Sequence, residues 1–472
     1  MPVRPIAHPE EVHDASSTSP AVLDAGALER LRANVLARDI ALATTVSLVL
    51  GLIRLGTPSF WVDETFTAAE MNYSLVDKLD IQYHFLHLVL IDIWAAVVGT
   101  SEVALRLPSV LGAMAAVGLL VVVGNKLFDR RVALVAGLLL ATSPFLVKWS
   151  QQARAYSMFV ALCLLAMLLL LRAFERNTRG AWAAFGVALS VVIVWQPAAG
   201  FLMLPAYGIL IVQRRQSFLP HGLLAAVIVA VLAVPWAGVT AMRSTGEGVN
   251  FNWLKFPTAE SAAWTVLDVS GAAGLGVLLA GVGLWVLRRT GRSELTVWLG
   301  GWAFIPFALA LVVSTFRPIY LDRFLSGAAP AFALLAAVAL LGVSRRLRWI
   351  GVAALVAATT IGLAQWYAPK DGGNWRGEDW RSATRTVLAL RQPGDDLVVV
   401  PWWARRGAEY YGARPHDIST ADSIWTLSWS ETGHDLPSSQ RARLGFGEHV
   451  LADEREFGWR IRAQHWVRPG TS

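Results

Sequence analysis

The chain has 472 residues, of which 55% are hydrophobic and only 16% are charged. Soluble domains carry roughly 25% charged residues, and a water-soluble protein of this length needs more polar surface than this composition supplies. The mean hydropathy of +0.48 and the 21 tryptophans, a residue enriched at membrane interfaces, favour an integral membrane protein. The net charge of +7 suits either nucleic acid or anionic lipid, so the distribution of the basic residues must decide between them.

The N-terminal segment does not resemble a signal peptide. Met1–Gly26 contains Pro, Ser, Thr and acidic residues and has no central apolar run. We expect residues 1–38 to form a disordered cytosolic tail. The single cysteine, Cys163, lies in an apolar segment and excludes an intrachain disulfide.

Apolar segments follow one another from residue 39 to residue 368. This pattern predicts a transmembrane module of about eleven helices, with boundaries that extend a little beyond the most apolar stretches. The expected spans are Ile40–Leu55, Leu105–Gly124, Val132–Val147, Tyr156–Leu171, Ala181–Trp195, Ala198–Val212, Gly222–Val239, Gly271–Leu287, Leu295–Val313, Phe324–Val343 and Trp349–Trp366.

One apolar segment, His84–Val98, is not counted among the spans. It contains His84, His87 and Asp92, and a charge at mid-bilayer costs about 2.5–3.5 kcal/mol on insertion scales. A helix that lies along the interface avoids this cost. We therefore place His84–Val98 flat on the membrane, inside a first outer loop that covers residues 57–104.

The basic residues support this topology. With the N-terminus inside and His84–Val98 at the interface, every expected cytosolic segment is basic, as the positive-inside rule requires. Counting His84–Val98 as a span would break this alternation. Because the basic clusters are short and flank membrane segments, nucleic acid is excluded as a partner. The residues concerned are Arg30, Arg32, Arg38, Lys126, Arg130, Arg131, Arg172, Arg176, Arg179, Arg214, Arg215, Arg288, Arg289, Arg292, Arg345, Arg346 and Arg348.

The composition changes after Pro369, and residues 369–472 are polar and rich in Trp and Arg. An odd number of spans places this region on the extracytoplasmic side. Its pattern predicts a small α/β domain. The expected helices are Glu378–Arg391 and Ala404–Tyr411, and the expected strands are Leu397–Val400 and Arg460–Val467.

Candidate functional residues gather in the expected outer loops. Asp63 and Glu64 follow the first span, and two adjacent carboxylates at the membrane boundary can act as a general base with its electrostatic partner, or can bind a divalent cation. Arg154 and Arg323 stand where later spans meet the outer surface, at the depth of a lipid phosphate that a guanidinium fork can bind. Taken singly, each group also fits a plainer interpretation: solvated loop acids, an arginine that snorkels to the interface, or a salt bridge between Asp322 and Arg323.

Five sequence motifs follow one another along the chain. They are Trp61–Glu64; Gly99–Glu102 with Ala104–Ser109; Ser143–Phe145 with Ser150–Tyr156; Arg323–Leu325 with Pro330; and Glu378–Arg381 with Pro393–Asp395. Together they resemble the GT-C glycosyltransferases, in particular the protein-mannosyltransferase-like family 39 group of actinobacterial type. The motifs occur in the family's order and cover most of the chain.

The resemblance implies a GT-C fold and the inverting transfer of a sugar, mannose-like or other, from a polyprenyl-phosphate donor to a hydroxyl of a glycan, lipid or protein acceptor. The first acid of the loop motif is the base in this family, which carries onto Asp63 with Glu64 beside it. The arginine that holds the lipid phosphate carries onto Arg154, and Arg323 is the second expected phosphate ligand. The family often has Glu at the position of Gln152. The residues expected to support the site are Gln152, Tyr156, His84 and Tyr320.

Two other classes of function are compatible with the sequence. A membrane transporter or lipid flippase would have charges and broken helices near mid-membrane and an inverted repeat, whereas here the charges gather in outer loops. A non-catalytic membrane scaffold would not depend on Asp63. The sequence therefore predicts an α-helical polytopic membrane enzyme of GT-C type in the lipid bilayer, without naming its sugar, its acceptor or a metal.

Overall fold

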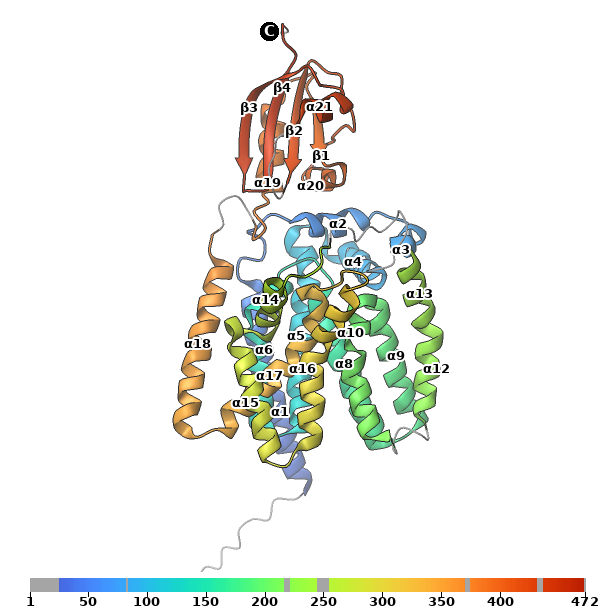
Figure 1. Cartoon of the computed structure of the whole chain (residues 1–472), viewed down its shortest axis with the longest axis vertical. Coiled ribbons are helices and arrows are strands. Elements are labelled where there is room, and N and C mark those ends of the chain that lie inside the picture. The colour runs from blue at the N-terminus through green and yellow to red at the C-terminus, as the bar shows by residue number, and fades with distance from the viewer. Residues whose placement is uncertain are drawn as a thin grey trace, which may run out of the picture.

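The structure is a computed structural model that describes residues 25–81, 84–215, 221–243, 254–369, 374–430 and 436–470. A bundle of long helices carries a small α/β domain, formed by the C-terminal residues, on one end (the domain end; Figure 1). The expected disordered tail lies outside the described residues as far as residue 24. From Ala25 onward the prediction was wrong, because helix α1 (Ala25–Leu52) begins there. The Ala, Leu, Glu and Arg residues of this segment are strong helix formers.

Each expected span coincides with one helix or with a broken pair of helices. The helices of the bundle after α1 are α5 (Glu102–Leu127), α6 (Arg130–Ala141), α7 (Pro144–Ser150), α8 (Tyr156–Arg176), α9 (Arg179–Trp195), α10 (Pro197–Gln213), α12 (Gly222–Leu232), α13 (Val234–Arg243), α14 (Ala259–Ser270), η1 (Ala272–Gly274), α15 (Leu275–Arg289), α16 (Ser293–Ser314), η2 (Asp322–Ala328), α17 (Ala329–Gly342) and α18 (Arg345–Tyr367).

The protein has the architecture of a multi-span membrane protein. Within the described ranges, seven helices are long and apolar enough to cross a membrane, or nine if each of two bent helix pairs is one span. The apolar helices α9 and α10, at 17 residues each, are shorter than the roughly 20 residues of a typical span. Since they occupy two of the expected spans, the number of about eleven spans stays a prediction.

The expected span Val132–Val147 is not straight. Its two halves, α6 and α7, are bent by 57° at a break before Pro144. Proline lacks the backbone N–H that would continue the helix, and it disfavours the helical conformation of the residue before it, here Ser143. The break lets α7 turn away from the axis of α6, so that the turn between α7 and α8, with the Ser150–Tyr156 motif, reaches the domain end.

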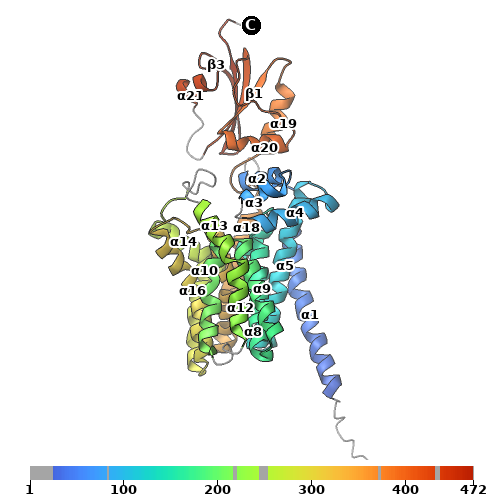
Figure 2. The same cartoon turned by 90° about the vertical axis from the view of Figure 1, so that its right-hand side faces the viewer.

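The first loop forms three short helices at the domain end of the bundle, and the first of them lies next to the C-terminal domain (Figures 1 and 2). They are α2 (Val62–Glu70), α3 (Leu75–Ile81) and α4 (Phe85–Val98). The expected helix at His84–Val98 is therefore confirmed as a helix, and its place in the membrane interface stays a prediction. The charge of Asp92, which argued against a span, is paired with Lys78 at 2.6 Å.

The C-terminal residues form the expected α/β domain, with helices α19 (Trp380–Leu390), α20 (Arg405–Tyr410) and α21 (Ser438–Arg443). Its strands β1 (Asp396–Val400), β2 (Ser423–Trp429), β3 (Val450–Phe457) and β4 (Ile461–Val467) make one sheet in the order β1-β2-β4-β3. Strand β1 is parallel to β2, and the other pairs are antiparallel. The expected helices and the strands β1 and β4 occur close to their expected bounds. Strands β2 and β3 were not predicted.

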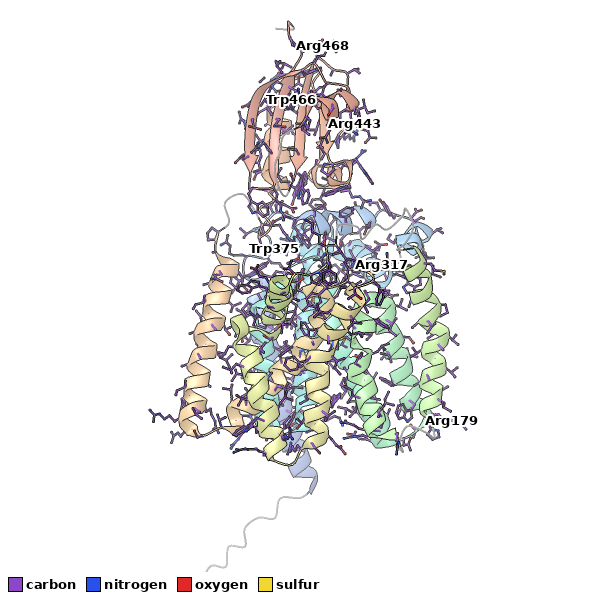
Figure 3. All side chains as sticks on the ribbon, in the orientation of Figure 1. Arg179, Arg317, Trp375, Arg443, Trp466 and Arg468 are labelled. Carbon is purple, nitrogen blue, oxygen red and sulfur yellow. The ribbon has the colours of Figure 1, made fainter. Side chains whose placement is uncertain are left out.

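The two ends of the bundle carry different parts of the sequence. Arg179, from an expected cytosolic segment, lies at the end opposite to Arg317 and Trp375, which come from expected outer segments (Figure 3). This separation agrees with the predicted alternation of the loops. Which end faces the cytosol stays a prediction.

Candidate active site

The structure brings Asp63 and Arg323 together at the domain end of the bundle. Asp63 lies in the first turn of α2, and Arg323 lies in η2, immediately before α17. The distance between Oδ2 of Asp63 and Nη2 of Arg323 is 3.8 Å. The Asp63 side chain keeps 24% of its surface exposed, whereas the Arg323 side chain keeps 7%. The site therefore pairs a carboxylate that a substrate can reach with a largely buried cation.

Glu64 faces away from this pair and is buried. Its carboxylate accepts two hydrogen bonds of 2.8 Å from the guanidinium of Arg106, and a third of 2.8 Å from the backbone N–H of Ala153. Successive residues of an α-helix point about 100° apart, because the helix has 3.6 residues per turn. Asp63 and Glu64 are therefore directed to different surroundings. This placement favours a structural role for Glu64 over the expected catalytic one.

A divalent cation shared by Asp63 and Glu64 does not fit this arrangement. Both Glu64 oxygens are bonded to Arg106, so the two carboxylates do not converge. Across the described part of the chain, no group of three or more His, Cys, Asp or Glu side chains is placed to hold a metal ion.

Arg154 is also at the site, and its contacts reach α2. Its Nη1 donates to the backbone carbonyl of Asp63 and to the hydroxyl of Thr67, each at 3.0 Å. Its Nη2 lies 3.0 Å from Nε2 of His84. Because a guanidinium only donates, this nitrogen of His84 accepts. Burial, together with the charge of Arg154, holds the pKa of His84 well below its ordinary value, so the ring is neutral. Arg154 thus ties α2 to the turn before α8 and to the loop before α4.

Tyr156 joins the two predicted phosphate arginines. Its ring centroid is 5.7 Å from Cζ of Arg154 and 5.9 Å from Cζ of Arg323. The phenol oxygen is 3.5 Å from Nη2 of Arg154. An aromatic face attracts cations at these distances, so Tyr156 helps to hold two like charges near each other.

Gln152 and Tyr320, which were also expected to support the site, contact the local backbone. The amide of Gln152 donates to the carbonyl of Lys148 at 3.1 Å. The hydroxyl of Tyr320 donates to the carbonyl of Ala262 in α14 at 3.1 Å. Both residues hold the loops that carry the arginines, and no contact between either of them and Asp63 is seen among the described residues.

The sequence prediction named Glu378–Arg381 only as a motif of the outer domain and did not place the segment before α19 at the site. The Oε2 atom of Glu378 accepts a 2.7 Å hydrogen bond from the backbone N–H of Val62, at the start of α2. Arg376 stacks on Trp61, with Cζ 4.8 Å from the ring centroid. A signal existed for the first contact. The N-cap of α2 is Trp61, which has no side-chain oxygen, so the N–H groups of its first turn need an acceptor from elsewhere.

Glu378 is fully buried, and burial raises its pKa to about 7. The N–H of Val62 and the charges of Arg376 and Arg460 oppose this rise. Of these two cations, Arg460 forms an ion pair with the carboxylate, with Nη1 3.7 Å from Oε1. The carboxylate that anchors the start of α2 therefore titrates near neutral pH.

Comparisons with known proteins agree with this architecture. Residues 85–238 match a family model described as dolichyl-phosphate-mannose-protein mannosyltransferase. The crystal structure of ArnT from Cupriavidus metallidurans bound to undecaprenyl phosphate superimposes with a TM-score of 0.62 at 14% identity, covering 90% of this chain and 97% of that one. The chain has the GT-C fold. The apo oligosaccharyltransferase of Archaeoglobus fulgidus also resembles it, with a TM-score of 0.53 at 13% identity over 80% of this chain and 64% of the archaeal one.

The resemblance to the GT-C superfamily that the motifs indicated is thereby confirmed, and the actinobacterial type stays a prediction. No curated protein sequence matches the chain at a significant level. Since one fold hosts many activities, the activity has to be argued from the site itself.

Proposed function

We propose that this GT-C protein is an inverting glycosyltransferase that moves a sugar from a polyprenyl phosphate to a hydroxyl acceptor. The observation that carries the proposal is the pairing of the partly exposed Asp63 carboxylate with the buried Arg323 guanidinium at 3.8 Å. One group can take a proton and the other can bind a phosphate. The similar fold of an ArnT bound to undecaprenyl phosphate supports a lipid phosphate as the donor.

The chemistry follows from the charges. As the bond between the anomeric carbon and the phosphate oxygen breaks, positive charge develops on the sugar and the electron pair stays on the phosphate. Arg323 stabilises the departing phosphate, and Asp63 takes the proton of the acceptor hydroxyl, which attacks the opposite face of the sugar. Positioned base catalysis contributes about 10²–10⁴-fold, and holding both substrates in line contributes further.

In the free protein, Arg323 and Asp63 neutralise each other in part. When a donor phosphate binds, it competes for the guanidinium, and the Asp63 carboxylate is released to accept a proton. Arg154, also expected as a phosphate ligand, contributes by fixing the backbone of Asp63 through its 3.0 Å hydrogen bond. Arg323 thus interacts with both the donor phosphate and Asp63, and Arg154 fixes the backbone of Asp63, so these two arginines couple donor binding to the position of the base.

The domain end is proposed to face the extracytoplasmic side, with the C-terminal domain above the site and the N-terminus in the cytosol. The basic loop residue Arg179 lies at the opposite end (Figure 3), which is the arrangement that the positive-inside rule favours. The acceptor is a hydroxyl of a glycan, a lipid or a protein. The gathering of charges at the domain end argues against a transporter, whose charges would line the middle of the membrane.

The proposal is tested by Asp63→Asn in purified protein with a polyprenyl-phosphate sugar as the donor. We expect most transfer to be lost while the variant folds and still copurifies with lipid donor, because a base acting in the transition state contributes little to ground-state binding. Asp77→Asn, an exposed acid in the same loop, is the matched control. Folded Asp63→Asn with parental activity would exclude Asp63 as the base. Mass spectrometry of the copurified lipid would identify the head group.

A further inference from the structure

The segment Asn374–Glu378 is fixed against the start of α2 at two points. The amide nitrogen of Asn374 donates to the carbonyl of Ser59 at 3.3 Å, and Glu378 accepts from the N–H of Val62 at 2.7 Å. The side-chain oxygen of Asn374 also accepts from the backbone N–H of Arg376 at 2.8 Å. Arg376 is therefore held between two anchors, directly beside the turn that leads to Asp63.

The Arg376 guanidinium lies against two indole rings, with Cζ 4.8 Å from the centroid of Trp61 and 4.3 Å from that of Trp375. Its Nε is buried and, within the described residues, has no hydrogen-bond partner. The pKa of Arg376 is lowered, first by burial and then by the charge of Arg323, while Asp63 opposes the shift. Arg376 and Arg323 are therefore like charges that act on each other, and Asp63 is the carboxylate that acts on both of them.

Arg323 is buried and Arg376 is half-buried. The guanidinium groups of Arg323, Arg376 and Arg154 interact with the carboxylates of Asp63, Asp322 and Glu378, and burial raises the pKa of Glu378 to about 7, so positive charge is in excess. Such an excess is unfavourable in a site of low polarity unless an anion enters. A phosphate supplies several acceptor oxygens for the planar forks of two arginines. The indole rings pack against the flat face of the Arg376 guanidinium, so the N–H groups at its edge keep their capacity to donate hydrogen bonds to a ligand.

We propose that Arg376 binds the same lipid phosphate as Arg323, so that the segment leading into the C-terminal domain completes the phosphate site of the helical bundle. This inference rests on the proposed function. In the transfer, the bond from the anomeric carbon to the phosphate oxygen breaks, a bond to the acceptor oxygen forms, and the hydroxyl proton goes to Asp63. The phosphodiester of the donor becomes a phosphomonoester, whose charge at pH 7 is about −1.5 to −2. A further cation matters most for this product-like state.

The test compares Arg376→Gln with the parent and with Arg414→Gln, which removes an exposed arginine of the C-terminal domain. The full-length protein is titrated with a short-chain prenyl phosphate, with the corresponding prenyl alcohol and with inorganic phosphate, and the unfolding temperature is recorded without ligand. In Arg376→Gln we expect roughly tenfold weaker binding of prenyl phosphate, unchanged binding of prenyl alcohol, and an unfolding temperature that does not fall, because a repelled charge has been removed. Arg414→Gln should match the parent throughout.

The outcomes separate this inference from the proposed function. Prenyl phosphate binding in Arg376→Gln that equals the parent's would overturn the phosphate role of Arg376 and leave the transferase proposal standing. A lower unfolding temperature with unchanged affinity would show that Arg376 only packs against the indole rings. Inorganic phosphate that binds the parent as tightly as prenyl phosphate would overturn the assignment to a lipid phosphate. A parent protein that binds no prenyl phosphate would overturn both proposals.

Discussion

Replacing Glu64 by Gln tests whether the two adjacent carboxylates have separate tasks. The change removes one negative charge and keeps the shape of the side chain. Glu64 and Arg106 are buried, with 1% and 3% of their side chains exposed, and are joined by two hydrogen bonds of 2.8 Å. The new amide would keep an oxygen for the N–H of Ala153, but it would offer Arg106 a neutral partner.

The expected loss of stability in Glu64→Gln follows from the burial of the ion pair. Removing one member of a buried ion pair costs about 3–5 kcal/mol, because the other charge is left without compensation. The total stability of a typical folded domain is about 5–15 kcal/mol, so this loss is a large fraction of it. Breaking an exposed ion pair costs only about 0–1 kcal/mol. Lys126 and Glu175 form such a pair at 2.8 Å, with 28% and 54% of their side chains exposed, so Glu175→Gln is the matched control.

The assay records thermal unfolding of the purified variants in detergent, together with transfer activity per folded molecule. We expect Glu64→Gln to unfold at a clearly lower temperature than the parent and Glu175→Gln to unfold close to it. Asp63→Asn should show the opposite profile, with lost activity and nearly parental stability. The reasoning is refuted if Glu64→Gln is as stable as the parent, or if folded Glu64→Gln is as inactive as Asp63→Asn.

Three further predictions concern the site and the topology. Arg323→Ala should reduce donor use roughly ten- to a hundred-fold, as expected for a lost hydrogen bond to a charged group. Arg154→Lys should lower turnover because one ammonium cannot contact α2 and His84 together. Parental steady-state kinetics in both variants would contradict these two expectations. The pKa of Glu378 is raised from 4.5 to about 7. Between these two pH values the folded protein keeps a proton that the unfolded chain loses. The free energy of unfolding should therefore fall as the pH rises from 4.5 to about 7. Unfolding temperatures measured across this pH range should fall in the parent and stay level in Glu378→Gln. An identical pH profile in both proteins would contradict the raised pKa of Glu378. In a background without the native cysteine, an impermeant reagent on intact cells should label Ser438→Cys and spare Ser19→Cys, and the reverse pattern would invert the topology.

Much of the helical bundle could be predicted because the bilayer sets both the length and the composition of its spans. The break before Pro144 was missed, since an apolar run of that length looks the same whether or not it bends. Strand β3 was missed for a different reason. Its residues include Asp453, Glu454, Arg455 and Glu456, and it lies at the edge of the sheet. Charged residues protect such an edge from pairing with another chain, and they also hide the strand in the sequence.

The candidate site was predictable in part, because residues at the outer ends of predicted spans lie at the same depth in the membrane. That reasoning selected Asp63, Arg154 and Arg323, which the structure gathers at the domain end. It could not separate Asp63 from Glu64, because the direction of each side chain depends on where α2 begins and on what packs against it. It also missed Arg376, whose neighbour Trp61 is far away in the sequence. Only the tertiary contact shows that the two segments belong together.

The contacts of α2 connect the C-terminal domain with the proposed chemistry. On the bundle side, α2 is held by Arg154. On the other side it is held by the domain: Arg406 of α20 stacks on Phe66 with Cζ 4.4 Å from the ring centroid, and Glu378 bonds the first turn. The Tyr411 hydroxyl accepts from the N–H of Phe60 at 2.9 Å, just before the helix. These contacts reach the backbone next to Asp63, the proposed base. We therefore expect the position of Asp63 to depend on the docked domain, since α2 is short and its anchors come from both the bundle and the domain.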